Sequence, residues 1–244
     1  MKISVVVPTL DTKYLTRACV EAVLASRLPE GTEMEVLVVD DGSSDGTGED
    51  LAGRPGVRVL RNERPTGYAR AVNRGVREAT GDLLFLLNSD TEIEPGSLAC
   101  AVEAFASDEK IGVVGAALVF PDGTPQWSAG REPDLLWLFG QASRLPALLG
   151  KVPGWRRLKP LHAALPVDVG WVSGAAMMVR ASVWRECGPF DCAYGFYAQD
   201  LDFCLQARDK GWRVRLLPGF RIPHHLGATI SPDLDGRNGN ADLG

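Results

Sequence analysis

Short apolar runs alternate with segments of helical period along the first half of the chain. The runs are rich in Val, Ile and Leu, as buried strands are, and they occupy residues 3–8, 36–39, 57–60, 83–87 and 111–119. Between them, apolar residues recur every three or four positions, which predicts helices; one predicted face comprises Leu15, Ala18, Cys19, Ala22 and Val23. This alternation predicts the α/β class, with a Rossmann-like, mostly parallel central sheet flanked by helices.

The second half of the chain has a less regular pattern. We expect strands and helices over residues 171–179, 181–187, 200–210 and 214–217. Gly211 directly follows the second of these helices, where glycine commonly ends a helix. The whole pattern predicts a single compact domain with halves at residues 1–110 and 111–230. Residues 231–244 are rich in Gly, Asp and Asn, which predicts a flexible tail.

Composition narrows the class of protein. The chain has 244 residues, and 31 acidic against 26 basic residues give a net charge of −5, which argues against nucleic acid as a partner. Its five cysteines show no CxxC spacing, which favours a reducing compartment. We find no secretory signal and no run near the ~20 apolar residues of a membrane span. We therefore expect a cytoplasmic protein, and peripheral contact with the inner face of the plasma membrane stays open.

Polar residues follow each of the first four predicted strands. They are Thr9 and Asp11, the segment 40–47, Asn62, and the segment 88–90. Any one polar strand end is typical of a solvated loop. Because ligands of open α/β sheets bind beyond the carboxyl ends of the strands, four such ends together predict one ligand crevice.

The motifs that are missing restrict the ligand of this crevice. The chain has no GxGxxG after its first strand and no GxxxxGK[ST], so dinucleotide-binding and P-loop sites are not predicted. Carboxylates repel a diphosphate unless a cation bridges them, and Asp90 could hold Mg²⁺ or Mn²⁺ for this purpose. A haloacid-dehalogenase-type phosphatase would need two aspartates separated by one residue. Asp40 and Asp41 are adjacent and Asn88 stands two before Asp90, so this reading ranks low.

Taken together, the motifs resemble the inverting family-2-type glycosyltransferases of the GT-A fold, including rhamnosyltransferases. The matching segments run in order up to about residue 229: 5–9 (VVVPT), 38–47 (VVDDGSSDGT), Asn62, 67–75 (GYARAVNRG), 81–82 (GD), 88–90 (NSD), 172–175 (VSGA), 188–191 (GPFD), 199–202 (QDLD) and 224–225 (HH). Each piece alone is weak, but the ensemble is specific. The resemblance implies a nucleotide-sugar-binding first half and an acceptor-binding, catalytic second half.

The resemblance also implies residue roles. Thr9 and Asp41 would contact the nucleotide base, Asn62 the base or ribose, and Asn88 the ribose. Asp90 and His224 would hold the divalent cation, while Asp200 would be the general base that deprotonates the acceptor hydroxyl. Acceptor-side residues would be Trp171, Gly174, Gln199 and Asp202. The implied substrates are a UDP-, dTDP- or GDP-linked sugar and a glycan or lipid-linked acceptor, as in polysaccharide or cell-wall biosynthesis.

Two departures from the family pattern keep other functions open. Gln199 replaces a common Glu, which removes a charge on the acceptor side, and Asn88 replaces the first Asp of a strict DxD, which leaves fewer anionic ligands for the metal. A catalytically degenerate sugar-nucleotide-binding or scaffold protein remains the alternative. A nucleotidyltransferase ranks low because no Gly-rich, basic loop follows the first strand. Residues 131–166 combine an apolar stripe with basic residues, which fits a core helix or an interfacial helix at a membrane.

Overall fold

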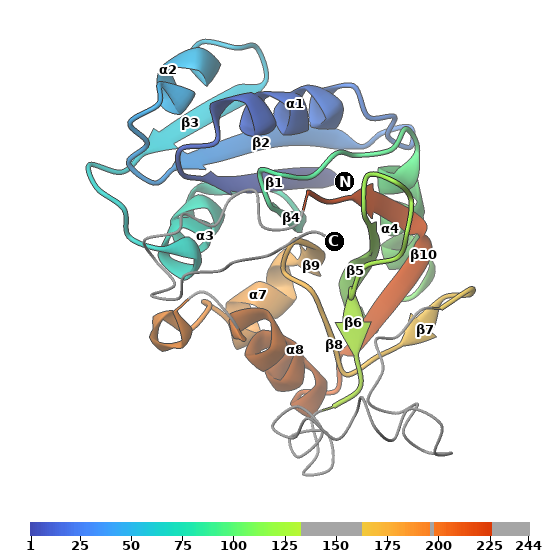
Figure 1. The fold of residues 1–244 in the computed structure, drawn as a ribbon. Helices are drawn as coiled ribbons and strands as arrows, with labels where there is room; N and C mark the ends of the chain where they lie inside the picture. The colour runs from blue at the N-terminus through green and yellow to red at the C-terminus, as the bar shows by residue number, and fades with distance from the viewer. Residues whose placement is uncertain (133–162, 196–197, 226–244) are drawn as a thin grey trace, which may run out of the picture.

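The computed structural model describes residues 1–132, 163–195 and 198–225, which form an α/β architecture (Figure 1). The main sheet has eight strands in the order β3-β2-β1-β4-β9-β5-β10-β7, and β6 and β8 form a separate two-stranded sheet. Elements from both halves of the chain build the main sheet. The predicted α/β class with a central sheet flanked by helices is therefore confirmed.

The elements have the following bounds. The strands are β1 Lys2–Thr9, β2 Glu33–Asp40, β3 Val57–Arg61, β4 Leu83–Leu87, β5 Ile111–Val119, β6 Ala129–Gly130, β7 Val167–Asp168, β8 Trp171–Val172, β9 Ala176–Arg180 and β10 Arg213–Pro223. The helices are α1 Lys13–Leu24, α2 Thr47–Leu51, α3 Tyr68–Glu78, α4 Ser97–Ser107, α7 Ala181–Cys187 and α8 Gln199–Asp209, with a short 3-10 turn at Cys192–Tyr194.

The first four strands are parallel and in register. Thr9 at the end of β1 pairs with Asp40 of β2, which in turn pairs with Arg61 at the end of β3. Because parallel strands end on the same edge, the polar residues that follow them are brought together. The edge predicted from the sequence therefore exists.

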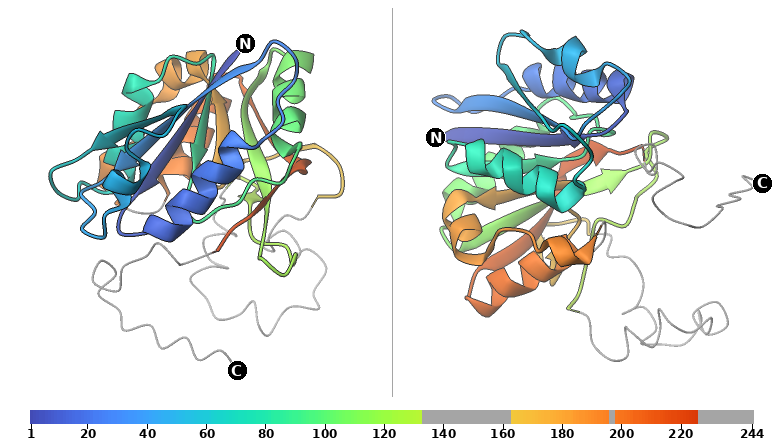
Figure 2. Two further views of the ribbon diagram at one scale, coloured as in Figure 1. Left: turned by 90° about the horizontal axis from the view of Figure 1, so that it is seen from above. Right: turned by 90° about the vertical axis from the view of Figure 1, so that its left-hand side faces the viewer.

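Helices cover both faces of the main sheet, as Figure 2 shows from two further sides. Alternate residues of β1 point to opposite faces. Val5 packs in one buried cluster with α1 and α4, and Val6 packs in the other with α3, α7 and α8. Within the described residues, no helix is long and apolar enough to cross a bilayer.

Three local predictions were wrong. The strand expected over residues 171–179 is two strands, β8 and β9, because residues 173–175 leave the ladder and bond to other segments. The last strand is longer than expected and continues past a register shift to Pro223. Helix α1 buries Thr16 instead of Ala18, since the Thr16 hydroxyl bonds to the buried Thr9 hydroxyl. The proposed interfacial helix lies mostly, and the flexible tail entirely, outside the described residues.

Candidate active site

Asp41, which follows β2, is enclosed by hydrogen bonds. Its carboxylate accepts from the side chain of Asn62 at 2.5 Å, from the Thr66 hydroxyl at 2.7 Å, and from the backbone amides of Thr66 at 2.9 Å and Gly67 at 2.8 Å. Asp41 is only 4% exposed. The structure thus brings the predicted base-contacting residues Asp41 and Asn62 into direct contact, where they fix the loop between β3 and α3.

Thr9 lies in a cluster of buried hydroxyl groups. Its hydroxyl is 2.8 Å from that of Thr12 and 2.7 Å from that of Thr16, and Thr12 reaches Ser89 at 3.2 Å. The Thr9 carbonyl accepts the amide of Asp41 at 2.8 Å. The cluster therefore ties the end of β1 to the segment that follows β4.

Asp90 and His224 meet although 134 positions separate them along the chain. The end of β10 runs antiparallel to residues 90–92, with the amide of His225 donating to the Asp90 carbonyl at 2.9 Å. This pairing places the His224 Nε2 atom 3.3 Å from Asp90 Oδ1. His225 points elsewhere and pairs with Glu92 at 3.0 Å, in agreement with the choice of His224 over His225.

The Asp90 carboxylate fits a cation site. Asp90 is 1% exposed, and neither of its carboxylate oxygens accepts a hydrogen bond from any residue that the structure describes. Leaving a buried carboxylate without partners costs several kcal/mol, which a bound cation would offset. No cluster of three or more His, Cys, Asp and Glu occurs in the described parts of the chain. Among the described residues, a cation here would be held by Asp90 and His224.

Gln126 supports His224, a contact that the sequence analysis missed. Its side-chain oxygen lies 2.9 Å from His224 Nδ1, and its amide nitrogen donates to the carbonyls of Val119 at 3.2 Å and His224 at 2.6 Å. A glutamine in a turn after a strand carries no signal of this kind in the sequence, because the contact spans 98 positions.

Asp200 lies in the first turn of α8, which begins after Ala198 in the left-handed conformation, with φ of 76°. Its carboxylate accepts from the amides of Gly174 at 2.7 Å and Leu201 at 2.8 Å. Burial raises the pKa of Asp200 and outweighs these hydrogen bonds, which lower it. A Cβ atom added at Gly174 would lie 3.2 Å from the Asp200 Cβ, so glycine permits this close approach.

Tyr68 connects the Asp200 and Asp90 regions, and the sequence analysis assigned it no role. Its hydroxyl donates to the Gly174 carbonyl at 3.0 Å. Burial raises the pKa of Tyr68, and the negative charges of Asp200 and Asp90 raise it further. The next carbonyl, that of Ala175, accepts the amide of Asn88 at 2.9 Å. Residues 174–175 thus join the predicted base to the predicted metal and ribose segment.

The remaining predicted acceptor-side residues have different surroundings. Trp171 is 8% exposed, and its ring packs edge-on against Trp127 with 5.1 Å between ring centroids. Trp127 is the more accessible of the two at 44%. Gln199 is buried, while Asp202 accepts from Gln206 at 2.7 Å and from the Tyr194 hydroxyl at 3.3 Å.

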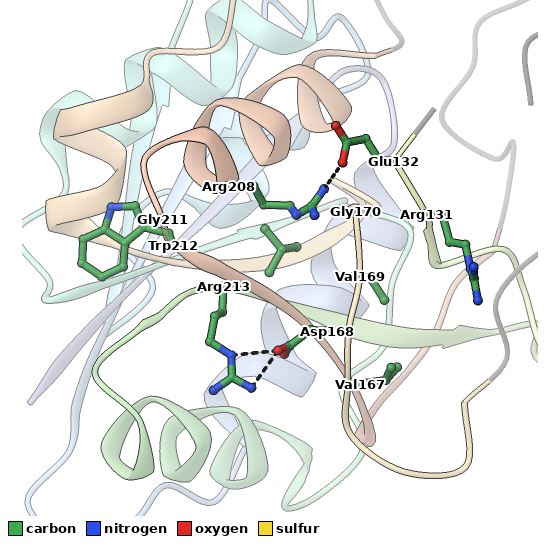
Figure 3. Close-up of a pocket in the computed structure, with 11 residues that line it drawn as sticks. Arg131, Glu132, Val167, Asp168, Val169, Gly170, Arg208, Gly211, Trp212 and Arg213 are labelled. Atoms are coloured by element: carbon green, nitrogen blue, oxygen red, sulfur yellow. Dashed lines mark hydrogen bonds and ion pairs between the residues drawn. The ribbon is translucent and has the colours of Figure 1, made fainter. Parts of the chain in front are cut away.

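A cavity of about 550 Å³ lies elsewhere, at the start of β10 and the end of α8 (Figure 3). None of the predicted site residues lines it. Four of its charged side chains form pairs, Arg208 with Glu132 at 2.9 Å and Arg213 with Asp168 at 2.7 Å. His224 follows the other end of the eleven-residue strand β10, about 30 Å along the strand at ~3.3 Å per residue. The cavity is therefore separate from the Asp90 and His224 pair.

The fold and the strand-end site define a GT-A glycosyltransferase architecture. In agreement, the chain is similar in structure to GalNAc-T7 with UDP, GalNAc and Mn²⁺ (TM-score 0.70, 19% identity, 91% of this chain and 43% of the other). It is also similar in structure to a mannosyltransferase from Pyrobaculum calidifontis in complex with GDP-Man and Mn²⁺ (TM-score 0.63, 20% identity, 91% of this chain and 56% of the other).

Sequence comparison identifies the family. The model of glycosyl transferase family 2 matches residues 4–159. An N-acetylglucosaminyl-diphospho-decaprenol L-rhamnosyltransferase of Mycobacterium tuberculosis is 31% identical over 93% of this chain and 78% of its own length. An O-antigen biosynthesis protein of Myxococcus xanthus is 28% identical over 95% of this chain but only 18% of its own length. The chain belongs to glycosyl transferase family 2, and the predicted resemblance is confirmed.

Proposed function

We propose that the protein is a metal-dependent, inverting glycosyltransferase that moves a sugar from a nucleotide-diphosphate donor to a hydroxyl group. The observation that carries the proposal is a buried carboxylate, Asp90, that accepts no hydrogen bond from the described residues. It is linked through residues 174–175 to a second, partly buried carboxylate, Asp200. The proposal gives Asp90 the role of cation ligand and Asp200 the role of proton acceptor. A single displacement at an anomeric carbon needs both functions.

Asp90 and His224 would hold the divalent cation, Mg²⁺ or Mn²⁺. Bound there, the cation would neutralise the negative charge that grows on the diphosphate leaving group. The nucleotide would lie over the ends of β1, β2 and β4, with Thr9, Asp41 and Asn62 shaping the base side and Asn88 the ribose side. Asp41 acts in this arrangement mainly by fixing residues 62–67, since its oxygens already accept four hydrogen bonds.

Asp200 would remove the proton of the acceptor hydroxyl as this oxygen attacks the anomeric carbon. The amides of Gly174 and Leu201 hold its carboxylate in place. Burial favours its protonated form, so the ionised carboxylate is a stronger base than an exposed aspartate. A general base of this kind contributes about 10²–10⁴-fold to the rate.

The substrate assignment rests on the relatives. The Mycobacterium tuberculosis relative is an L-rhamnosyltransferase whose name specifies a diphospho-decaprenol acceptor, which favours a rhamnosyl donor and a lipid-linked acceptor here. UDP-, dTDP- and GDP-linked sugars are all candidates for the donor. Acceptor-side contacts would come from Trp171, Gly174, Gln199 and Asp202. A lipid-linked acceptor would also bring the protein to the inner face of the plasma membrane.

Turnover with a panel of nucleotide sugars tests the proposal. The parent protein should release nucleotide with one donor in the presence of Mn²⁺ or Mg²⁺ and an acceptor, and NMR of the product should show inverted anomeric configuration. Asp200→Asn should release nucleotide about 10²–10⁴-fold more slowly. Asp209→Asn, an exposed carboxylate on the same helix, serves as the matched control and should keep parental activity.

A catalytically degenerate nucleotide-sugar-binding protein is the second candidate, because buried Gln199 stands where relatives commonly carry Glu. This function predicts binding without turnover. If a donor raises the melting temperature but the parent and Asp200→Asn release nucleotide at the same background rate, the scaffold function replaces the enzymatic one.

A further inference from the structure

We infer that Gln126 is a positioning residue that fixes the tautomer of His224, so that the Nε2 lone pair faces Asp90. The role of this contact in cation binding rests on the proposed function. The tautomer itself does not, because it follows from hydrogen bonds within the protein.

The orientation of the Gln126 amide is determined by its surroundings. One end of the amide faces two carbonyl oxygens, those of Val119 at 3.2 Å and of His224 at 2.6 Å. Carbonyl oxygens only accept hydrogen bonds, so this end must be the NH₂ group. The amide oxygen therefore faces His224 Nδ1 at 2.9 Å.

This orientation assigns the proton on the imidazole ring. An amide oxygen cannot donate, so Nδ1 must carry the hydrogen that joins it to Gln126. In the neutral ring, Nε2 then has no hydrogen and directs a lone pair toward Asp90 Oδ1, 3.3 Å away. Two acceptors that face each other in a buried site repel unless a positive charge lies between or beside them. Such an imidazole, held by a hydrogen bond at its other nitrogen, is the form that ligates metal ions.

The Gln126 backbone is held independently of its side chain. Its amide donates to the Leu118 carbonyl at 2.9 Å, and the neighbouring Pro125 pairs with Val119. Two positions further on, the Ser128 hydroxyl accepts the amide of Leu118 at 2.7 Å. Substitution of Gln126 should therefore leave this segment in place, which makes side-chain variants informative.

Two variants distinguish control of the His224 tautomer from a structural role in which Gln126 only joins neighbouring segments by hydrogen bonds. Gln126→Leu and Gln126→Glu both lose the two hydrogen bonds to the Val119 and His224 carbonyls. Only Gln126→Glu keeps an oxygen that can accept from His224 Nδ1. A purely structural role predicts that the two variants behave alike, whereas tautomer control predicts that they differ.

Long-range ¹⁵N–¹H correlation spectra of the metal-free protein report the tautomer directly. The chain has three histidines, and His225→Gln assists the assignment. At a pH where the ring is neutral, His224 should carry its hydrogen on Nδ1 in the parent and in Gln126→Glu. In Gln126→Leu the hydrogen should move to Nε2, where it can donate to Asp90. An unchanged tautomer in Gln126→Leu, with the parent fold retained, would overturn the inference.

Titration with Mn²⁺, followed by the electron paramagnetic resonance signal of the free ion, tests the consequence. Gln126→Leu should bind Mn²⁺ about 10–100-fold more weakly than the parent, and Gln126→Glu should retain more of the affinity. Equal losses in both variants would contradict a role in cation binding. A parent with the Nδ1–H tautomer that binds no Mn²⁺ would refute the metal site of the proposed function and support the tautomer assignment.

Discussion

Asp41 and Asp90 follow parallel strands of the same sheet and are both buried, yet their surroundings are opposite. Asp41 accepts four hydrogen bonds from the loop between β3 and α3. Asp90 accepts none from the described residues, and His224 Nε2 lies 3.3 Å from its Oδ1. Since a buried carboxylate needs compensation, the described residues complete the first but leave the second without a hydrogen-bond donor.

The difference separates two tasks at one sheet edge. The Asp41 region is held in one conformation by the protein itself, and its backbone segments pack closely. A Cβ atom at Gly42 would lie 2.8 Å from the Arg64 carbonyl carbon, and the φ of +88° at this position also favours glycine. The Asp90 region keeps acceptors that no described residue uses. Under the proposed function, preformed surroundings for the nucleotide and an incomplete ligand set for the cation together suit a donor that arrives with its metal.

The largest expected effect is on activity at Asp90. Asp90→Asn removes the only carboxylate of the cation pair, so turnover should fall by about 10³-fold, equivalent to ~4 kcal/mol of transition-state stabilisation. The melting temperature of the metal-free protein should not fall, because no hydrogen bond within the described residues is lost. The rise in melting temperature that Mn²⁺ gives the parent should disappear.

Asp209→Asn controls for the removed charge, since this carboxylate is exposed. Melting curves with and without Mn²⁺ and initial rates provide the measurement. If Asp90→Asn strongly destabilised the metal-free protein, Asp90 would stabilise the fold as Asp41 does, and the proposed difference between the two residues would be contradicted.

The main effect of Asp41→Ala should be a loss of stability. The change leaves the partly buried amides of Thr66 and Gly67 without an acceptor and removes the hydrogen bonds from Asn62 and the Thr66 hydroxyl, so unfolding free energy should drop by about 2–4 kcal/mol. For a chain of this size that is a decrease in melting temperature of about 5–15 °C. The Mn²⁺-induced rise should persist, measured well below the new melting temperature. A stable variant that no longer responds to Mn²⁺ would reverse the assigned roles.

Glu35 is a carboxylate on β2, away from the site, and its substitution should have an effect of intermediate size. Burial raises its pKa, but hydrogen bonds from Ser4 at 2.5 Å and from the Thr80 amide and hydroxyl at 2.8 Å outweigh this and lower its pKa to about 2. A depressed carboxyl pKa stabilises the fold above the unfolded value near 4.5, and this contribution is lost as the pH falls toward 2.

Glu35→Gln should therefore lower the unfolding free energy by about 1–3 kcal/mol at pH 7. The difference from the parent should shrink between pH 4.5 and 2. Urea unfolding at several pH values measures both quantities. A difference that stays constant across this range would show that the charge of Glu35 is not responsible.

The smallest expected effect is a displacement of the pH profile. Because burial raises the pKa of Asp200 above its ordinary value of 3.8, the acidic limb of kcat/KM should lie above that value. A base must be ionised to act, so activity should fall as the pH decreases through this limb. A limb at or below 3.8 would argue against Asp200 as the base.

Tyr68→Phe keeps the aromatic ring but removes the hydroxyl group that donates to the Gly174 carbonyl. This variant should change the reaction rate with little effect on the fold.

The sequence alone predicted much of the parallel half of the fold. Apolar runs and helical spacing identified β1 to β5 and the helices between them, apart from the short α2. The match to a family pattern also predicted roles for Asp90, His224 and Asp200, and these roles stay predictions. These signals are local, because hydrophobic period and short motifs are encoded within about ten residues.

Only the tertiary structure decided which buried carboxylates accept hydrogen bonds from the described residues. The motifs give Asp41 and Asp90 different predicted roles, but nothing local shows that Asp41 accepts four hydrogen bonds and that Asp90 accepts none from the described residues. Gln126 and Tyr68 also acquire their roles from contacts across 98 and 106 positions. The break between β8 and β9 arises likewise, because Gly174 bonds to Asp200 and Tyr68 instead of to a strand. Hydrogen bonds between distant segments depend on how the whole sheet is assembled, and the local pattern of a sequence does not contain that information.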